Sequence, residues 1–215
     1  MSDNSGNQEN DSLYGEEREL GYKLFMPLMR AVFKLWYKPR IIGAEKIPKE
    51  GAIVIAGNHK HILDQCLTII ATKRMIHYMA KKEYFDGKFA WFFRAMGCIP
   101  VDRATTDIKS VKSAMKVLRK DGAIGIFPEG TRNRTDAFLL EFKPGAANLA
   151  KKTDAYIVPF GLTGDYKFRS KNLTVRYGEP FKADGMTAQE ASDRLYKEVE
   201  RLMREGIAEE EKMKK

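Results

Sequence analysis

Short apolar runs alternate with longer amphipathic stretches along most of the chain. Apolar runs of the kind found in covered strands lie at 52–56, 76–80, 98–101, 123–127, 156–160 and 173–177. Between them, apolar residues at helical spacing predict helices at 64–73, 88–96, 107–120 and 144–151, and Thr187 is expected to cap a long final helix. This alternation predicts an α/β fold with a mostly parallel sheet covered by helices.

The N-terminal segment has a different pattern. Residues 1–12 are polar and are expected to form a disordered tail, residues 13–38 an amphipathic helical element, and residues 39–215 one folded domain. Pro27 predicts a kink, or two shorter helices. The apolar residues that recur at helical spacing are Leu24, Phe25, Leu28, Met29, Val32, Phe33 and Trp36, and the basic residues beside them are Lys23, Arg30, Lys34 and Lys38. Such a helix can either pack on the domain or lie in a lipid headgroup layer.

Composition narrows the class of protein. The 215 residues include 38 Lys and Arg against 29 Asp and Glu, a formal net charge of +9, and 43 % hydrophobic residues, enough for a core. The longest stretch without a charged residue, Ala155 to Gly164, has ten residues, too few for a membrane-spanning helix. Two cysteines, Cys66 and Cys98, are expected as buried thiols in a reducing compartment. The positive charge indicates an anionic partner: nucleic acid, a membrane surface or a phosphorylated substrate.

The first candidate for chemistry is Gly57-Asn-His-Lys-His-Ile-Leu-Asp64, which follows an apolar run directly. His59 and Asp64 lie five residues apart across a strand-to-helix turn, and a carboxylate on one imidazole nitrogen would make the other a general base. Alternatively, Asp64 only caps the next helix. A metal site built on His59, His61 and Asp64 is disfavoured, because the chain has just one further histidine.

Further polar clusters follow other apolar runs. Arg103 ends Gly97-Cys-Ile-Pro-Val-Asp-Arg103, and Thr131 and Arg132 lie in Phe127-Pro-Glu-Gly-Thr-Arg-Asn-Arg134. Together with backbone N–H groups, the two arginines could hold one phosphate dianion, although each alone could be a surface ion-pair partner. The proline of Val158-Pro-Phe-Gly161 predicts an edge strand, a bulge or a pocket wall.

Taken in order, NHKHILD, GCIPVDR, FPEGTRNR and VPFG resemble the four sequence blocks of the 1-acyl-sn-glycerol-3-phosphate acyltransferase (PlsC-like) family, over about Ile41 to Tyr177. The resemblance implies that residues 39–215 form an acyltransferase domain in which His59 is the catalytic base and Asp64 orients it. It also implies substrate-binding roles at matching positions, which are Arg103, Glu129, Gly130, Thr131, Arg132 and Pro159. The family commonly has Ser where this chain has His61, a departure that bears on acceptor selectivity.

The resemblance further implies the reaction and its partners. The expected activity moves a fatty acyl group from acyl-CoA or acyl carrier protein to the 2-hydroxyl of lysophosphatidic acid, which gives phosphatidic acid. The acceptor could instead be glycerol 3-phosphate or another lysophospholipid, and a non-catalytic lipid-binding protein is the alternative from another class. An anionic membrane surface is an expected partner, at the cytoplasmic face and without a membrane span, whereas nucleic acid is not. Nothing in the sequence calls for a metal or an organic cofactor.

Overall fold

The computed structural model describes residues 16–102 and 107–214, and its middle layer is a seven-stranded sheet in the order β1-β7-β6-β2-β5-β3-β4. Every pair of neighbouring strands described is parallel except β6 and β7, which are antiparallel. The strands are β1 (Arg40–Ile42), β2 (Ile53–Gly57), β3 (Ile76–Lys81), β4 (Ile99–Val101), β5 (Ala123–Ile126), β6 (Tyr156–Thr163) and β7 (Thr174–Tyr177). The predicted mostly parallel α/β fold is confirmed.

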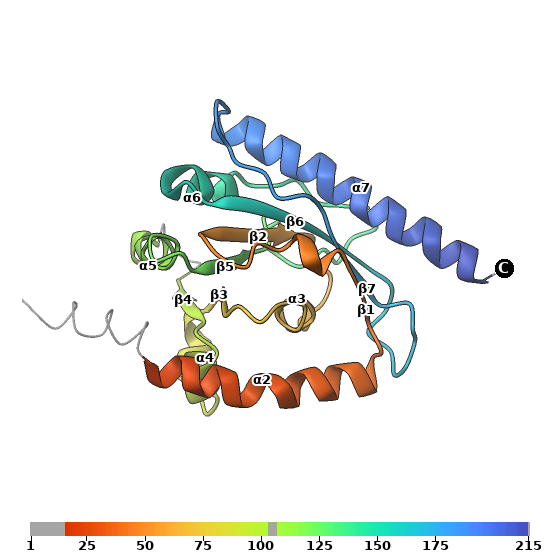
Figure 1. Ribbon diagram of the computed structural model, residues 1–215, viewed down its shortest axis with the longest axis horizontal. Coiled ribbons are helices and arrows are strands. Elements are labelled where there is room, and N and C mark those ends of the chain that lie inside the picture. The colour runs from red at the N-terminus through yellow and green to blue at the C-terminus, as the bar shows by residue number, and fades with distance from the viewer. Residues whose placement is uncertain (1–15, 103–106, 215) are drawn as a thin grey trace, which may run out of the picture.

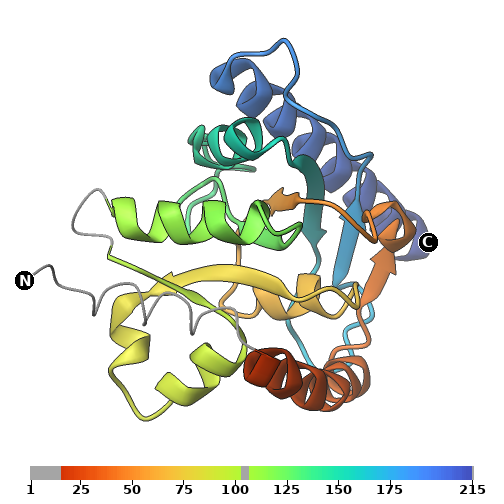
Figure 2. The ribbon, with the colours of Figure 1, turned by 60° about the vertical axis from the view of Figure 1, so that its left-hand side comes forward.

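Helices cover both faces of the sheet. In Figure 1, α6 and α7 lie above it, and α2 lies below it with α3 in between; Figure 2 shows α5 on the side of α6 and α7, and α4 beside α2. The helices are α2 (Glu16–Trp36), α3 (Asp64–Ile69), α4 (Ala90–Ala95), α5 (Ile108–Leu118), α6 (Gly145–Thr153) and α7 (Ala188–Lys214), with short 3₁₀ turns η2 (Ala44–Lys46) and η3 (Lys82–Phe85).

The core has two halves because successive side chains of a strand point to opposite faces of the sheet. In β2, Val54 and Ala56 belong to the cluster under α5, α6 and α7, whereas Ile53 and Ile55 belong to the cluster facing α2 and α3. All four side chains are fully buried. A central strand covered on both faces must be apolar at every position, which is why the pattern at 52–56 was recognisable.

Pro159 lies inside β6, which has β7 on one side and β2 on the other, so of the three predicted alternatives the edge strand is wrong. The bulge is confirmed. Ile157 forms a bridge to Phe181 and Phe160 pairs with Tyr177, so a step of three residues in β6 (157 to 160) faces a step of four in the following chain (177 to 181). Pro159 falls within this interruption of the ladder, where a residue without an N–H group is tolerated.

The N-terminal helix α2 is continuous through Pro27, so the two shorter helices are not seen. One face packs on the domain, with the side chains of Tyr22, Met26 and Phe33 at most 5 % exposed. Another face carries large apolar side chains that remain uncovered: Leu24 at 73 %, Leu28 at 63 %, Val32 at 51 %, Leu35 at 69 % and Trp36 at 54 % exposure. We call these five residues the α2 apolar face.

The expected disordered tail, residues 1–12, lies outside the described residues. Within the described ranges no helix is both long enough and apolar enough to span a bilayer. At the other end of the chain the predicted cap is confirmed. The Glu190 N–H donates to Thr187 Oγ1 at 3.2 Å, and the Thr187 N–H donates to the Glu190 carboxylate at 2.7 Å, which is a capping box at the start of α7.

Candidate active site

The candidate site begins where β2 ends. Gly57 allows β2 to approach β6 closely, because a Cβ atom there would lie 2.1 Å from the carbonyl oxygen of Phe160. The next residue, Asn58, is buried and forms two hydrogen bonds with the main chain of Leu162. Asn58 Nδ2 donates to the Leu162 carbonyl at 3.0 Å, and the Leu162 N–H donates to Asn58 Oδ1 at 2.7 Å. These contacts fix the backbone from which His59 projects.

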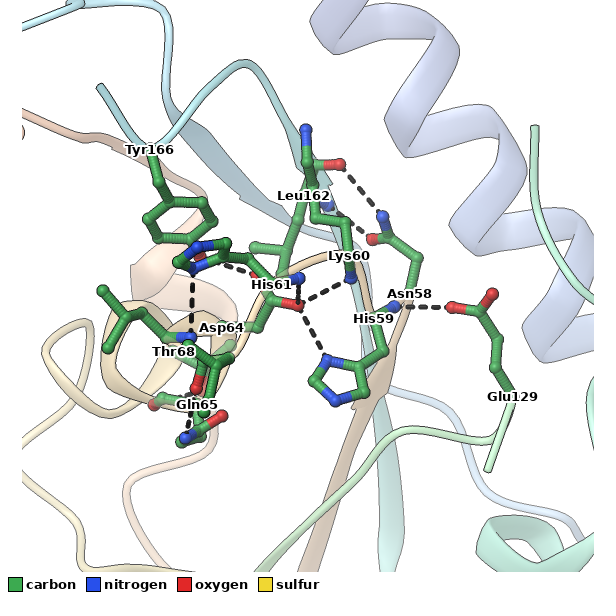
Figure 3. Close-up of polar contacts among 12 residues, drawn as sticks. Asn58, His59, Lys60, His61, Asp64, Gln65, Thr68, Glu129, Leu162 and Tyr166 are labelled. Atoms are coloured by element: carbon green, nitrogen blue, oxygen red, sulfur yellow. Dashed lines mark hydrogen bonds and ion pairs between the residues drawn. The ribbon is translucent and has the colours of Figure 1, made fainter. Parts of the chain in front are cut away.

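His59 and Asp64 form the predicted pair. The distance between His59 Nδ1 and Asp64 Oδ2 is 2.8 Å, and the side chains are 16 % and 0 % exposed (Figure 3). The imidazole stacks on the Phe127 ring, with centroids 3.9 Å apart and planes 12° apart. Since an ionised carboxylate only accepts hydrogen bonds, Nδ1 carries the proton and Nε2 carries the lone pair. The ring is therefore held as a base with a defined orientation.

Asp64 is surrounded by donors. The N–H groups of Lys60 and His61 both donate to Oδ2 at 2.7 Å, and the Tyr166 hydroxyl donates to Oδ1 at 2.7 Å. A buried carboxylate is tolerated only when it is hydrogen-bonded. Asp64 is the first residue of α3, but the capping alternative is wrong: Leu63 is at the N-cap position with no side-chain hydrogen bond, and the N–H groups that donate to Asp64 lie before the helix.

Glu129 joins the turn after β5 to the turn after β2. One carboxylate oxygen accepts from the His59 N–H at 2.5 Å, and the other accepts from the Leu140 N–H at 3.1 Å. The Asn133 N–H in turn donates to the His59 carbonyl at 2.7 Å. Burial raises the pKa of Glu129, and the two N–H donors oppose that rise. Both hydrogen bonds of the Glu129 carboxylate are thus to main-chain N–H groups, and one of them holds the backbone of His59 in place.

The turn that follows Glu129 presents polar groups to solvent. Gly130 has φ 70°, a left-handed conformation that glycine adopts readily, and Thr131 beside it is exposed. Arg132 is half-buried, two residues from Gly130. A Cβ atom on Gly130 would lie 3.3 Å from Lys143 Nζ, so this ammonium group is also at the turn. Such a turn can bind a phosphate through N–H groups and cations.

The structure brings together most of the predicted site residues. His59 and Asp64 touch, and Glu129, Gly130, Thr131 and Arg132 follow one another in the turn joined to them. Arg103 lies outside the described residues. Pro159 is buried in β6 opposite Ala56, and its ring lies next to Gly178.

His61 does not extend the pair toward a metal site. Its ring stacks on Tyr166, with centroids 4.3 Å apart, and its Nδ1 accepts from the Leu63 N–H at 3.3 Å. Among the residues that the structure describes, no group of three or more His, Cys, Asp and Glu side chains is arranged to hold a metal ion.

The sequence does not mark several residues of the site. Asn58 lies in the first polar cluster without a predicted role, and Lys143 and Tyr166 belong to none of the predicted clusters. Tyr166 lies 102 residues after Asp64, in the loop between β6 and β7, and no local pattern marks it. Lys60 Nζ donates to the carbonyl of Gly164 in the same loop. Such contacts depend on how distant segments meet.

Comparison with known proteins places the chain among acyltransferases. A family model described as Acyltransferase matches residues 38–163, a range that includes His59, Asp64 and the turn after β5. A 1-acyl-sn-glycerol-3-phosphate acyltransferase of Bacillus subtilis is 29 % identical over 84 % of this chain and 92 % of its own length. A protein of the same name from Borreliella burgdorferi is 34 % identical over 73 % of this chain and 65 % of its own length.

A solved structure has the same fold. The crystal structure of the 1-acyl-sn-glycerophosphate acyltransferase PlsC from Thermotoga maritima superposes with a TM-score of 0.73, covering 93 % of this chain and 87 % of that one. The two sequences are 23 % identical, so the likeness concerns the fold.

Proposed function

The chain belongs to the acyltransferase family, and on that premise we propose that it transfers a fatty acyl group from an acyl thioester to the 2-hydroxyl of 1-acylglycerol 3-phosphate, which gives phosphatidic acid. The names of the Bacillus and Borreliella relatives support this acceptor. The observation that carries the proposal is the 2.8 Å contact between His59 and Asp64, at a backbone that Glu129 ties to the turn bearing Arg132.

His59 would act as general base and then as general acid. Its Nε2 takes the proton of the acceptor hydroxyl while that oxygen attacks the thioester carbonyl carbon and a C–O bond forms. Asp64 stabilises the imidazolium through Nδ1–H. When the tetrahedral intermediate collapses, the C–S bond breaks and the thiolate receives the proton from Nε2. The products are the ester and the free thiol, and no acyl-enzyme forms.

The turn after β5 would hold the acceptor phosphate. Arg132 offers a two-pronged guanidinium, Lys143 adds a second cation, and Gly130 and Thr131 offer backbone and hydroxyl donors close by. Arg103 is proposed to join them on the basis of the family resemblance alone. Glu129 would contribute by bracing His59, and Pro159 would serve the acyl-donor side. The donor is an acyl thioester of coenzyme A or of acyl carrier protein.

The test uses purified full-length protein with a labelled acyl thioester and lysophosphatidic acid in mixed micelles. Turnover should disappear in His59→Ala while the variant still folds and binds lipid. His77→Asn is the matched control, because His77 Nδ1 contacts the Gly97 carbonyl at 2.8 Å and the asparagine Nδ2 can replace that donor. Turnover in His59→Ala equal to that of the unmodified protein would remove His59 from the mechanism. Glycerol 3-phosphate and other lysophospholipids in the same assay identify the acceptor.

The α2 apolar face would bring the site to its lipid, with the protein bound peripherally at the cytoplasmic side of an anionic membrane. Burying five partly exposed large apolar side chains gives about 1 kcal/mol each, or about 5 kcal/mol in all. Lys23, Lys34 and Lys38 are exposed and add about 1 kcal/mol each before screening. Arg30 adds less, because its Nη2 donates to the Thr72 carbonyl within the protein.

Vesicle co-sedimentation tests this docking. Deleting the helix would also expose the core that Tyr22 and Phe33 cover, so the substitution pair Leu24→Glu with Leu28→Glu is the better probe. It should lower the affinity for anionic vesicles at least tenfold. Ile207→Glu, at an exposed apolar residue of α7, should leave that affinity unchanged. Undiminished binding by the pair would place the membrane contact elsewhere.

A further inference from the structure

The loop between β6 and β7 reaches back to the His59 and Asp64 pair through one side chain. Tyr166 donates its hydroxyl proton to Asp64 Oδ1 at 2.7 Å, and Figure 3 shows its ring on the side of Asp64 away from His59. The β6–β7 loop, residues 164–173, thus contacts the Asp64 carboxylate, which also accepts hydrogen bonds from the turn after β2.

The two oxygens of Asp64 have different partners. Oδ2 receives three donors, which are His59 Nδ1 and the N–H groups of Lys60 and His61, whereas the donor seen at Oδ1 in the described residues is the Tyr166 hydroxyl. Asp64 is 0 % exposed, so Oδ1 has no access to bulk water. Removing its donor would leave a buried carboxylate oxygen unsatisfied.

Tyr166 is itself held in place. Its ring stacks on His61 at 4.3 Å and meets Tyr37 edge-on at 5.7 Å. The loop around it is fixed by Lys60 Nζ, which donates to the Gly164 carbonyl, and by the Arg169 N–H, which donates to the Trp36 carbonyl at 2.7 Å. Burial and the adjacent Asp64 raise the pKa of Tyr166 well above its ordinary range, so the hydroxyl keeps its proton at neutral pH.

We infer that Tyr166 is a positioning residue for the proposed acyl transfer, which acts by fixing the Asp64 carboxylate in the orientation and charge state that His59 needs. The inference rests on the proposed function. A donor to a carboxylate stabilises its ionised form, and the Asp64 carboxylate contacts the His59 ring at 2.8 Å. Without the hydroxyl, the protonated form of the pair is favoured and His59 is less often available as a base.

The inference predicts which kinetic constants change. Tyr166→Phe should lower kcat about tenfold, because it removes one hydrogen bond to a charged group and keeps the ring that stacks on His61. KM for lysophosphatidic acid should stay within about twofold, since Tyr166 is not part of the turn at Arg132. The acid limb of the rate profile should move upward by about half a pH unit.

Other titratable or charged groups face the pair, and they remain unchanged in this variant. They come from α3, from β3 and from the turn after β5, and are Cys66, Tyr78 and Glu129. Lys60 and His61 contact Asp64 through their N–H groups, while their side chains contact the Gly164 carbonyl and the Tyr166 ring. A displacement of the acid limb in Tyr166→Phe is therefore due to the lost hydroxyl.

The experiment compares the unmodified protein, Tyr166→Phe, Tyr37→Phe and His59→Ala by steady-state kinetics from pH 5 to 9, with thermal unfolding measured for each. Tyr37→Phe removes a hydroxyl from the neighbouring ring and should leave kcat and the acid limb unchanged. Replacing Tyr166 by 3-fluorotyrosine, which keeps the hydroxyl and makes it a stronger donor, should move the acid limb to lower pH. This second variant tests the inference even where Tyr166→Phe unfolds.

The outcomes separate the two proposals. An inactive His59→Ala together with the lowered kcat and the moved acid limb of Tyr166→Phe supports both. An inactive His59→Ala with an unchanged kcat and acid limb in Tyr166→Phe overturns the role of Tyr166 and leaves the proposed function standing. Full turnover in His59→Ala overturns the proposed function, and the role of Tyr166 with it.

Discussion

Replacing Asp64 by Asn tests how much the carboxylate charge contributes to the reaction. The change conserves the shape of a side chain that is fully buried and accepts four hydrogen bonds. With the amide oxygen at the Oδ2 position, the donors from His59, Lys60 and His61 keep an acceptor. The amide NH₂ then faces the Tyr166 hydroxyl, which can turn to accept. We therefore expect the variant to fold, with a loss of about 1–3 kcal/mol in the free energy of unfolding.

The rate should fall far more than the stability. In the proposed mechanism His59 becomes positively charged during proton transfer, at 2.8 Å from the Asp64 oxygen, which places the two charge centres about 4 Å apart. At an effective dielectric constant of about 20, their attraction is about 4 kcal/mol. A neutral amide forfeits this attraction, so kcat should fall about 10³-fold.

The assay is kcat with saturating acyl thioester and lysophosphatidic acid, together with urea unfolding of the same preparations. Asp154→Asn is the control. Asp154 is exposed, pairs with Lys182, and has φ 53°, a conformation that asparagine also adopts, so this variant should be fully active. A folded Asp64→Asn protein that keeps more than a third of the original kcat would refute the electrostatic argument.

Two further predictions concern stability and thiol chemistry. Thr187→Ala removes the cap of α7 and should cost about 1 kcal/mol in the free energy of unfolding measured with urea, whereas Thr187→Ser should cost little; equal stability of all three proteins would contradict the capping role. Burial raises the pKa of Cys66 to about 11 and that of Cys98 to about 12, so the reactive thiolate forms only as the pH rises toward those values. At pH 8 both thiols should label far more slowly in the folded protein than in urea, as followed by mass spectrometry, and equal rates would show that the thiols are accessible and ionised.

The order of strands and helices could be predicted because β2 and β5 carry no polar side chain, the other strands contain apolar runs, and the longer helices have one apolar face. β1 was missed, since its three residues are only half-buried and it becomes a strand through pairing with β7. The reversed direction of β7 was also not foreseen, although the connection after β6, residues 164–173, contains no helix that could carry a parallel crossover. The sequence could not decide between an edge strand and a bulge at Pro159, because both positions tolerate a residue without an N–H group, and only the pairing of β6 with both neighbours shows the bulge.

At the site, the sequence identified pairs that are close along the chain and turns that follow apolar runs. His59 and Asp64 were predicted from their spacing, and the contact confirms that they meet. The role of Glu129 in bracing the His59 backbone, and the approach of Tyr166 and Lys143, depend on contacts between segments 11 to 102 residues apart. No periodicity or local motif encodes such contacts, so they require coordinates.

The hydrogen bonds from the main chain at positions 60 and 61 to Asp64 bear on the departure from the family pattern at His61. What this turn requires of position 61 is an amide hydrogen, which every amino acid except proline supplies. The two main-chain hydrogen bonds to Asp64 are consequently independent of the side chain at position 61, whereas the stack that holds Tyr166 depends on it. A histidine in place of the usual serine therefore keeps the amide donor to Asp64 Oδ2 and adds an aromatic contact to the tyrosine that donates to Oδ1.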